Sequence, residues 1–353
     1  MLENKNEATS KLEVLGEFGL IENLTKGFEK KQKSTIKAIG DDAAVINNGT
    51  EDTVISTDML VEGVHFDVTY MPLKHLGYKA VVVNLSDIYA MNATPKQITV
   101  SIAVSSRYTV EALEEIYSGI KQACELYKID LIGGDTTSSL KGLVLSLTSI
   151  GSAPSQDLVY RNGAKENDLI CVSGDLGGAY MGLQVLEREK AVFRANPNMQ
   201  PDMTGNEYVL ERQLKPEARR DVIKALKDMH VMPTSMIDIS DGLASEIMHI
   251  CKQSKVGAQI YEDKLPIDYH TYKVAEDFNF NATTAALNGG EDYELLFTIS
   301  QKDFEVVKGI PGIAIIGHIT GDKSGISMVS RSEQVIELQA QGWNAFRNKS
   351  END

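Results

Sequence analysis

Residues 36–66 read IKAIGDDAAVINNGTEDTVISTDMLVEGVHF, and they join two predicted strands to a set of carboxylates. The β-forming runs 43–46 and 53–56 predict the strands, with a polar break between them. Asp41 and Asp42 precede the first run, and Asp58 follows the second. Carboxylate, hydroxyl and carbonyl oxygens at a strand end are the ligands that a hard divalent cation prefers. Taken alone, stretches such as Gly-Asp-Asp and Ser-Thr-Asp are more often ordinary polar turns.

Length and composition indicate a globular protein of two domains. The chain has 353 residues, of which 42% are hydrophobic and 24% charged. No apolar run approaches the ~18 residues of a membrane span, so we expect no membrane association. The polar N-terminus predicts no secretory signal. Three widely spaced cysteines suggest neither a disulfide framework nor a zinc site, so we expect a cytoplasmic protein.

The net charge of −15 argues against a nucleic-acid partner, for which a basic surface is expected. An acidic protein can still bind polyanions where metal ions reverse the local charge.

The order of predicted elements indicates an α/β sandwich. Polar and proline-containing residues at 151–168 place a domain boundary near residue 153, which gives domains 1–152 and 153–353. In the first half we expect helices over 16–31, 72–91 and 109–127 and strands over 43–46, 53–56, 97–104, 129–132 and 143–150. In the second half we expect helices over 179–189 and 242–251, strands over 169–172, 235–239, 258–261, 295–299 and 313–319, and an irregular insertion over 194–205.

The common phosphate-binding and catalytic motifs are absent from the sequence. It contains no Gly-Lys dipeptide and no G-x-G, which excludes a P-loop, a dinucleotide fingerprint and a kinase glycine loop. It also lacks HExxH and G-x-S-x-G, so neither a zinc protease nor a hydrolase nucleophile is supported.

What remains is a series of acidic residues, each beside Gly, Ser or Thr at the end of a predicted element. They are Asp41, Asp42, Asp58, Asp87, Asp135, Asp238 and Asp241, with Glu291 and Asp292 in NGGEDYE. We expect them to share one cleft, where two or more Mg²⁺ ions would bridge a nucleoside triphosphate. Asp87 is the strongest candidate, because its helix is otherwise apolar around residues 81–85 and 88 and an unpaired buried charge is costly.

The motifs GDDAAVI, STDMLVEGVHF, NLSDIYAMNATP, GGDTT, MIDISDGL and GGEDYEL occur in an order that resembles the thiamine-monophosphate kinase family. The resemblance runs from about residue 18 to residue 343. That family is grouped with aminoimidazole-ribotide synthetase, selenophosphate synthetase and a hydrogenase-maturation factor. The resemblance implies an α/β (α+β) fold of two-domain PurM-like architecture. Its ferredoxin-like N-terminal domain would dimerise, and an α/β C-terminal domain would complete the phosphate and substrate site.

The resemblance also implies which ligand each site residue binds. Magnesium would be held by Asp42, Ser56, Thr57, Asp58, Asp87, Asp135, Asp238 and Asp241. ATP would meet Tyr117, Gly134, Asp135, Arg161 and Ser240. Thiamine monophosphate would meet His65, Glu291 and Trp343. The glycine turn 173–178 departs from the family's Thr and Ser, so Asp175 has no assigned role.

Four of these residues have plain structural explanations on pattern alone. Trp343 could close a domain edge, and Tyr117 has the spacing of a helix core residue. His65 between Val64 and Phe66 fits a partly buried histidine, and Arg161 fits a surface residue at a linker.

The implied reaction moves the γ-phosphoryl group of ATP onto thiamine monophosphate, the last step of thiamine diphosphate biosynthesis. A phosphate monoester with a second pKa of about 6 is mostly dianionic near pH 7, so no general base is expected. Metal ions and Arg161 would offset the charge of the transferred oxygens. Trp343 would stack on the cationic thiazolium, with Glu291 as its counter-charge.

Two alternatives stay open at this stage. The first is amide activation of the aminoimidazole-ribotide synthetase type, and the second is a catalytically silent metal- or nucleotide-binding dimer. Selenophosphate synthetase is disfavoured, because no cysteine or glycine-rich reactive loop precedes Gly40.

Overall fold

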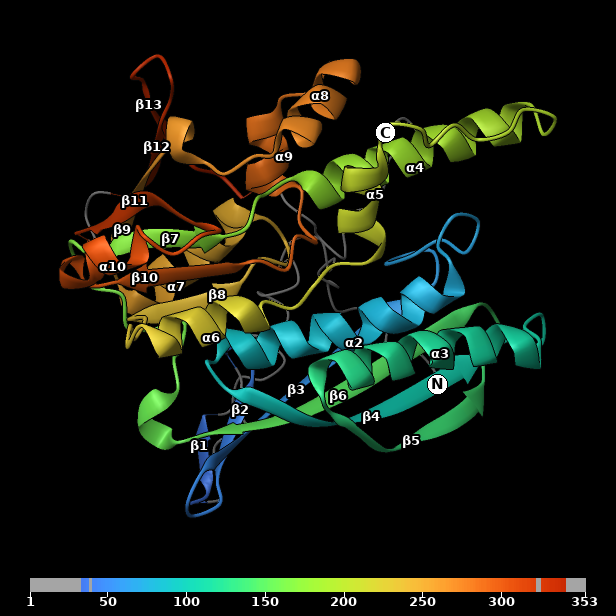
Figure 1. Ribbon diagram of the computed structural model, residues 1–353, viewed down its shortest axis with the longest axis horizontal. Coiled ribbons are helices and arrows are strands. Elements are labelled where there is room, and N and C mark those ends of the chain that lie inside the picture. Colours follow the sequence, from blue (N-terminus) through green and yellow to red (C-terminus); the bar gives the residue numbers. More distant parts are fainter. Residues whose placement is uncertain (1–32, 38–39, 322–324, 341–353) are drawn as a thin grey trace, which may run out of the picture.

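The computed structural model describes residues 33–37, 40–321 and 325–340, and it contains two mixed sheets with helices packed on them (Figure 1). The first half comprises β1 (Thr35–Lys37), β2 (Ala44–Asn47), β3 (Asp52–Val61), α2 (Leu73–Ala90), β4 (Thr94–Val104), α3 (Val110–Tyr127), β5 (Asp130–Ser138) and β6 (Leu143–Ala153). The second half comprises β7 (Leu169–Ser173), α4 (Gly178–Ala195), α5 (Glu207–Leu214), α6 (Arg220–Asp228), β8 (Ser235–Asp238), α7 (Leu243–Ser254), β9 (Gly257–Tyr261), α8 (Tyr269–Asp277), α9 (Ala282–Asn288), β10 (Leu295–Ile299), α10 (Phe304–Val307), β11 (Ile313–Thr320), β12 (Ile326–Val329) and β13 (Val335–Glu337).

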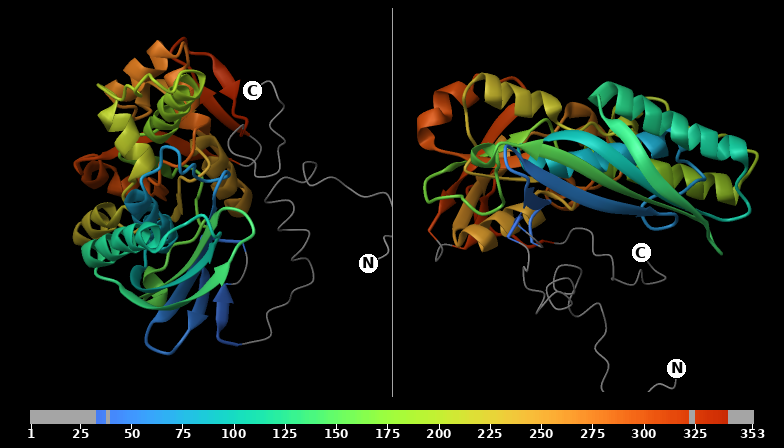
Figure 2. Two further views of the ribbon diagram at one scale, coloured as in Figure 1. Left: turned by 90° about the vertical axis from the view of Figure 1, so that its right-hand side faces the viewer. Right: turned by 90° about the horizontal axis from the view of Figure 1, so that it is seen from below.

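The first sheet has the strand order β1-β2-β3-β6-β4-β5, and helices α2 and α3 lie on one of its faces (Figure 2). Alternate residues of the central strands, such as Val100, Leu145 and Leu147, are buried under these helices. The helices approach closely at two glycines. A Cβ on Gly77 would meet the carbonyl oxygen of Ile116 at 1.9 Å, and one on Gly119 would meet that of Lys74 at 1.8 Å.

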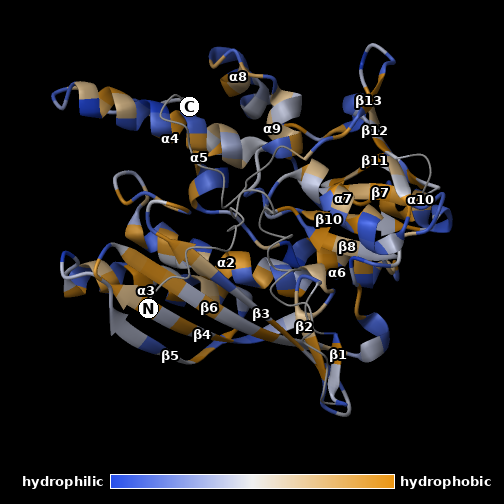
Figure 3. Cartoon of the chain, turned by 180° about the vertical axis from the view of Figure 1, so that it is seen from behind, coloured by the Kyte–Doolittle hydropathy of each residue, from blue (hydrophilic) through white to orange (hydrophobic). Residues whose placement is uncertain are grey.

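The second sheet has the order β13-β12-β9-β11-β7-β10-β8. Every residue of β8 and β10 is buried, and Figure 3 shows these strands as largely hydrophobic. One hydrophobic cluster joins residues of the first sheet and α2 to residues of α6, β8 and β10. Helix α2 therefore packs against both halves of the chain, which explains why its sequence is apolar on several faces.

Most of the expected elements are present. The helix expected over 72–91 is α2, and the helix expected over 109–127 is α3, which Thr109 caps by accepting a hydrogen bond from the Ala112 amide. The helix expected over 16–31 lies outside the described residues. Among the described helices, none combines the length and the apolar composition that a bilayer crossing requires.

Two boundaries differ in ways that matter for function. We expected the strand over 129–132 to end before GGDTT, but β5 continues to Ser138, because its backbone pairs with β4 in parallel register. We also expected Asp58 to follow a strand, but β3 runs on to Val61, so Asp58 lies within it. The expectation that every aspartate sits at the end of an element is therefore wrong for Asp58 and Asp135, while Asp87 lies in the last turn of α2.

Candidate active site

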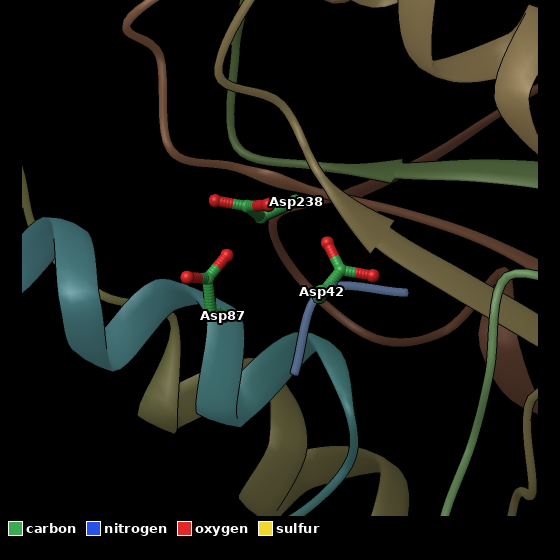
Figure 4. Close-up of side chains that lie close together, drawn as sticks. All are labelled: Asp42, Asp87 and Asp238. Carbon is green, nitrogen blue, oxygen red and sulfur yellow. The ribbon is translucent and has the colours of Figure 1, made fainter. Parts of the chain in front are cut away.

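Three aspartates from distant segments converge where α2 meets the second sheet. Asp42 precedes β2, Asp87 lies in α2 and Asp238 ends β8. Their carboxylates point toward one another (Figure 4), and one oxygen from each lies within 4.8 Å of the others. We refer to these three residues as the acidic cluster.

Neighbouring side chains fix the orientation of each carboxylate. Ser56 of β3 donates a hydrogen bond to Asp87, and Ser86 donates one to Oδ2 of Asp238 at 2.7 Å. Because Ser86 and Asp87 are consecutive in α2, this helix contacts two members of the cluster at once. Arg161 binds both oxygens of Asp42 through Nε at 2.8 Å and a terminal nitrogen at 2.9 Å.

Asp58 adds a fourth carboxylate beside the acidic cluster. Its backbone amide donates to Oδ1 of Asn84 at 3.2 Å, which ties β3 to α2 next to Asp87. The Oδ2 atom of Asp58 is buried and has no hydrogen-bond partner among the described residues. A buried acceptor of this kind can accept a contact from a cation or a donating ligand.

The electrostatics of the cluster follow from burial and mutual repulsion. Burial raises the pKa of Asp87 well above its usual value, and the nearby carboxylates of Asp58, Asp238 and Asp42 raise it further. Burial and Asp42 likewise raise the pKa of Asp238. Burial raises the pKa of Asp58 to about 6. Oxygen ligands under mutual repulsion, with an unsatisfied buried acceptor among them, fit a divalent cation such as Mg²⁺.

The predicted thiamine-phosphate residues His65 and Glu291 lie close together at the junction of the two halves. Nδ1 of His65 accepts a hydrogen bond from the Val61 amide at 3.0 Å. Burial lowers the pKa of His65, and the charge of Glu291 opposes this effect. Glu291 is bound by two side chains that the sequence analysis did not single out, Lys79 at 3.2 Å and Gln213 at 2.7 Å.

Three predicted nucleotide-binding residues lie apart from the acidic cluster. Tyr117, Gly134 and Asp135 line a hollow of about 470 Å³ between α3 and β5. Gly134 is in register with Asp58 across β4 and β6, so three strand spacings, about 14 Å, separate them. The structure therefore does not bring Asp135 together with the other aspartates in one chain.

The absence of a side chain at Gly134 has a structural cause in the sheet itself. A Cβ there would meet the carbonyl oxygen of Val100 in β4 at 1.8 Å. Close pairing with β4 therefore accounts for the second glycine of GGDTT.

The remaining predicted residues lie at two other places. Thr57 is exposed, and its hydroxyl bonds to the Leu147 carbonyl at 2.9 Å. The Ser240 carbonyl accepts from the Glu291 amide at 2.6 Å, and the Asp241 amide donates to Oε1 of Glu246 at 3.0 Å. The first of these contacts places a predicted ATP residue beside a predicted substrate residue. Trp343 lies outside the described residues.

Sequence reasoning missed Lys79, Ser86, Gln213 and Glu246. A signal existed for Lys79 and Ser86, because both stand in the apolar helix that singled out Asp87. Gln213 and Glu246 carry no local signal, since their roles come from tertiary contacts.

Comparison with known proteins gives a consistent result over both halves. Residues 40–153 match the N-terminal domain and residues 165–330 the C-terminal domain of the AIR synthase related protein family. The thiamine-monophosphate kinase of Buchnera aphidicola subsp. Schizaphis graminum is 37% identical over 94% of this chain and 98% of its own length. That of Bacillus subtilis is 34% identical over 94% of this chain and 100% of its own length.

Solved structures agree with these matches. A structure of AaThiL complexed with AMPPCP and TMP has a TM-score of 0.82 at 30% identity and covers 96% of this chain and 99% of its own. A protein from Thermus thermophilus, at 20% identity and a TM-score of 0.74, covers 93% of this chain and 100% of its own and shares the fold.

Proposed function

We propose, from the premise that this chain belongs to the thiamine-monophosphate kinase family, that it transfers the γ-phosphoryl group of ATP to thiamine monophosphate. The products are thiamine diphosphate and ADP. The observation that carries the proposal is the convergence of Asp42, Asp87 and Asp238 from three distant segments of the chain. Two polyanionic reactants repel each other, and a site that gathers carboxylates suits them only through intervening cations.

We propose that the acidic cluster and Asp58 hold Mg²⁺, with Ser56, Thr57 and Asp241 as the further ligands that the family resemblance suggests. Asp135 lies apart from them in β5 and would hold a separate Mg²⁺ at the nucleotide hollow. The buried, unpartnered Oδ2 of Asp58 supports this assignment. When bound, Mg²⁺ supplies positive charge that offsets the phosphate oxygens of donor and acceptor and helps to align them.

The chain's own residues then act by orientation. Ser56 and Ser86 fix two carboxylates, and Arg161 fixes Asp42 with a bidentate pair. A thiamine monophosphate dianion needs no proton removed before it attacks, so none of these groups has to act as a base. The carboxylates therefore serve as ligands and Arg161 as a fixed positive charge near the transferred group.

We assign the two ends of the site to the two reactants. The hollow lined by Tyr117, Gly134 and Asp135 would take part of ATP, and its separation of about 14 Å from Asp58 along the sheet suits an extended nucleotide. Ser240 would complete the ATP contacts. His65, Glu291 and Trp343 would bind thiamine monophosphate, and the interaction between the charge of Glu291 and His65 supports this assignment.

We also propose the organisation of the molecule. Residues 1–152 and 153–353 would form separate domains, which is supported by the assignment of β1 to β6 and β7 to β13 to different sheets. A homodimer through the N-terminal domain is supported by the outer face of its sheet, which no described helix covers (Figure 2). The alternating burial of β3 places Met59, which is 55% exposed, on that face. A cytoplasmic location is supported by three cysteines that form no disulfide.

The test is a reaction of the purified protein with ATP, Mg²⁺ and thiamine monophosphate, with nucleotide and thiamine products separated by chromatography. We expect thiamine diphosphate and ADP in equal amounts. Turnover only with aminoimidazole precursors would instead assign the chain to the amide-activating branch. Binding of ATP without any product would instead indicate a catalytically silent nucleotide-binding dimer.

A further inference from the structure

We infer that Lys79 is a positioning residue for the thiamine-phosphate end of the site, because it holds the Glu291 carboxylate in place from the other half of the molecule. This inference rests on the proposed function. It concerns recognition of the organic part of the substrate and makes no use of the acidic cluster.

The ammonium group of Lys79 is enclosed at the junction. Lys79 lies in α2, and its side chain is 2% exposed. Nζ donates to the backbone carbonyl of Gln213 at 2.9 Å and pairs with Oε1 of Glu291 at 3.2 Å. A buried lysine is costly unless it is paired, so its presence in the buried part of α2 indicates a specific task.

Glu291 is anchored at both oxygens. Lys79 binds Oε1, and Nε2 of Gln213 in α5 donates to Oε2 at 2.7 Å. The Glu291 side chain is nevertheless 29% exposed. A carboxylate has about four acceptor positions, so two remain for a ligand after the two anchors are made.

The backbone around Glu291 is held in an unfavourable conformation. Gly290, Glu291 and Tyr293 have φ angles of 70°, 58° and 51°, and for the last two residues this left-handed region is disfavoured. Hydrogen bonds from the Glu291 amide to Ser240 and from the Tyr293 amide to Ile239 fix the segment, at 2.6 and 2.9 Å. Backbone strain of this kind persists where surrounding contacts impose it, and it concentrates at ligand sites.

These observations assign separate roles to the two charges. Lys79 is too enclosed to touch a ligand without moving, so it acts through Glu291. Glu291 presents its open edge to a cation or an N–H donor, and thiamine carries both kinds of group. Because α2 belongs to one half of the chain and Gln213 and Glu291 to the other, the contact also sets Glu291 relative to the phosphate-transfer region.

The experiment is steady-state kinetics of the full-length protein with Lys79→Met, which keeps the length of the side chain and removes its charge. We expect the KM for thiamine monophosphate to rise about tenfold, the loss of about one charge-assisted hydrogen bond, while the KM for ATP stays within twofold. Lys74→Met, an exposed lysine of the same helix, is the matched control and should change neither constant.

A double-mutant cycle with Glu291→Gln separates positioning from general destabilisation. If Lys79 acts through Glu291, adding Lys79→Met to Glu291→Gln changes the KM for thiamine monophosphate less than twofold. An additive effect, or an equal rise of both KM values in Lys79→Met, overturns the inference. If Lys79→Met does not fold, Gln213→Leu decides: a selective rise in the KM for thiamine monophosphate supports the inference, and an unchanged KM overturns it.

The wild-type protein run in parallel distinguishes the two possible failures. Wild-type turnover with normal kinetics in Lys79→Met would overturn this inference alone. No thiamine diphosphate from the wild type would overturn the proposed function, and this inference with it.

Discussion

Two groups of buried carboxylates differ in the charge of the side chains that surround them. Glu294 is fully buried, but Arg212 lies 3.0 Å from one of its oxygens, Arg219 pairs with the other, and Ser173 donates to it at 2.5 Å. In the acidic cluster, Arg161 pairs with Asp42, while the groups that shift the pKa of Asp87 most, after burial, are three further carboxylates.

This difference distinguishes a structural network from a binding site. Burial raises the pKa of Glu294, but the two arginines oppose this effect, so the network contains its own positive charges. At Asp87 the neighbours add to the effect of burial, so the free energy of the folded state falls when a cation arrives. Removal of a carboxylate should therefore have opposite effects on stability at the two places.

The largest effect is expected for Asp87→Asn. The loss of one anionic ligand should lower kcat about 1000-fold, or about 4 kcal/mol of transition-state stabilisation. Without metal, the variant should unfold at the wild-type temperature or above it, because repulsion is relieved. Thiamine diphosphate formation and thermal melts measure both quantities, and near-normal turnover would refute the metal assignment.

The matching change in the balanced network is Glu294→Gln. It leaves Arg212 and Arg219 buried with one counter-charge fewer, so the free energy of unfolding should fall by about 3 kcal/mol. Turnover per folded molecule should stay within about threefold, because Glu294 contacts none of the proposed ligand residues. Denaturant titration with an activity assay tests this, and an increase in stability would show that the two groups do not differ.

A smaller effect is expected for the dependence of stability on pH and on Mg²⁺ binding. The folded-state pKa of Asp58 is about 6, and those of Asp87 and Asp238 also lie above the ordinary value of 3.8. Between pH 4 and 6 the folded protein therefore binds more protons than the unfolded chain, and the cluster's contribution to stability falls as pH rises. Bound Mg²⁺ should offset this loss of stability. At saturating Mg²⁺ and pH 7.5 the free energy of unfolding should rise by about 2 kcal/mol, and at pH 5 it should rise by less.

Melting curves with and without Mg²⁺ at the two pH values test this, with Asp87→Asn/Asp238→Asn as the reference. The reference is needed because His249, whose pKa burial lowers to about 4, acts in the opposite direction. A wild-type protein that gains no more from Mg²⁺ at pH 7.5 than the double variant would contradict the prediction.

The smallest effect is expected for Ser86→Ala. It removes the hydroxyl that donates to Asp238 at 2.7 Å, a contact worth about 1 kcal/mol. Turnover should fall about fivefold and the Mg²⁺ dependence should shift to higher concentration. A drop in kcat without any shift in Mg²⁺ dependence would mean that Ser86 does not act through the metal site.

Local pattern predicted much of the fold and part of the site. The apolar run of α2 and the β-forming runs around Asp42 and Asp58 were sufficient to place those elements, and a charge inside an apolar helix pointed to Asp87. Pattern could not show that β5 extends through Gly133 and Gly134, because pairing with β4 overrides the turn tendency of glycine. Nor could it show the contact of Lys79 with Glu291, which depends on how the two halves pack.

The most direct test of the central claim is a Mn²⁺ titration of the nucleotide-free protein followed by electron paramagnetic resonance, with Mn²⁺ as a substitute for Mg²⁺. We predict binding by the wild type and by Glu294→Gln, and affinity weaker by about 100-fold or more in Asp87→Asn/Asp238→Asn. Equal binding by all three proteins would contradict the account, because the unbalanced carboxylates would then not be what holds the cation.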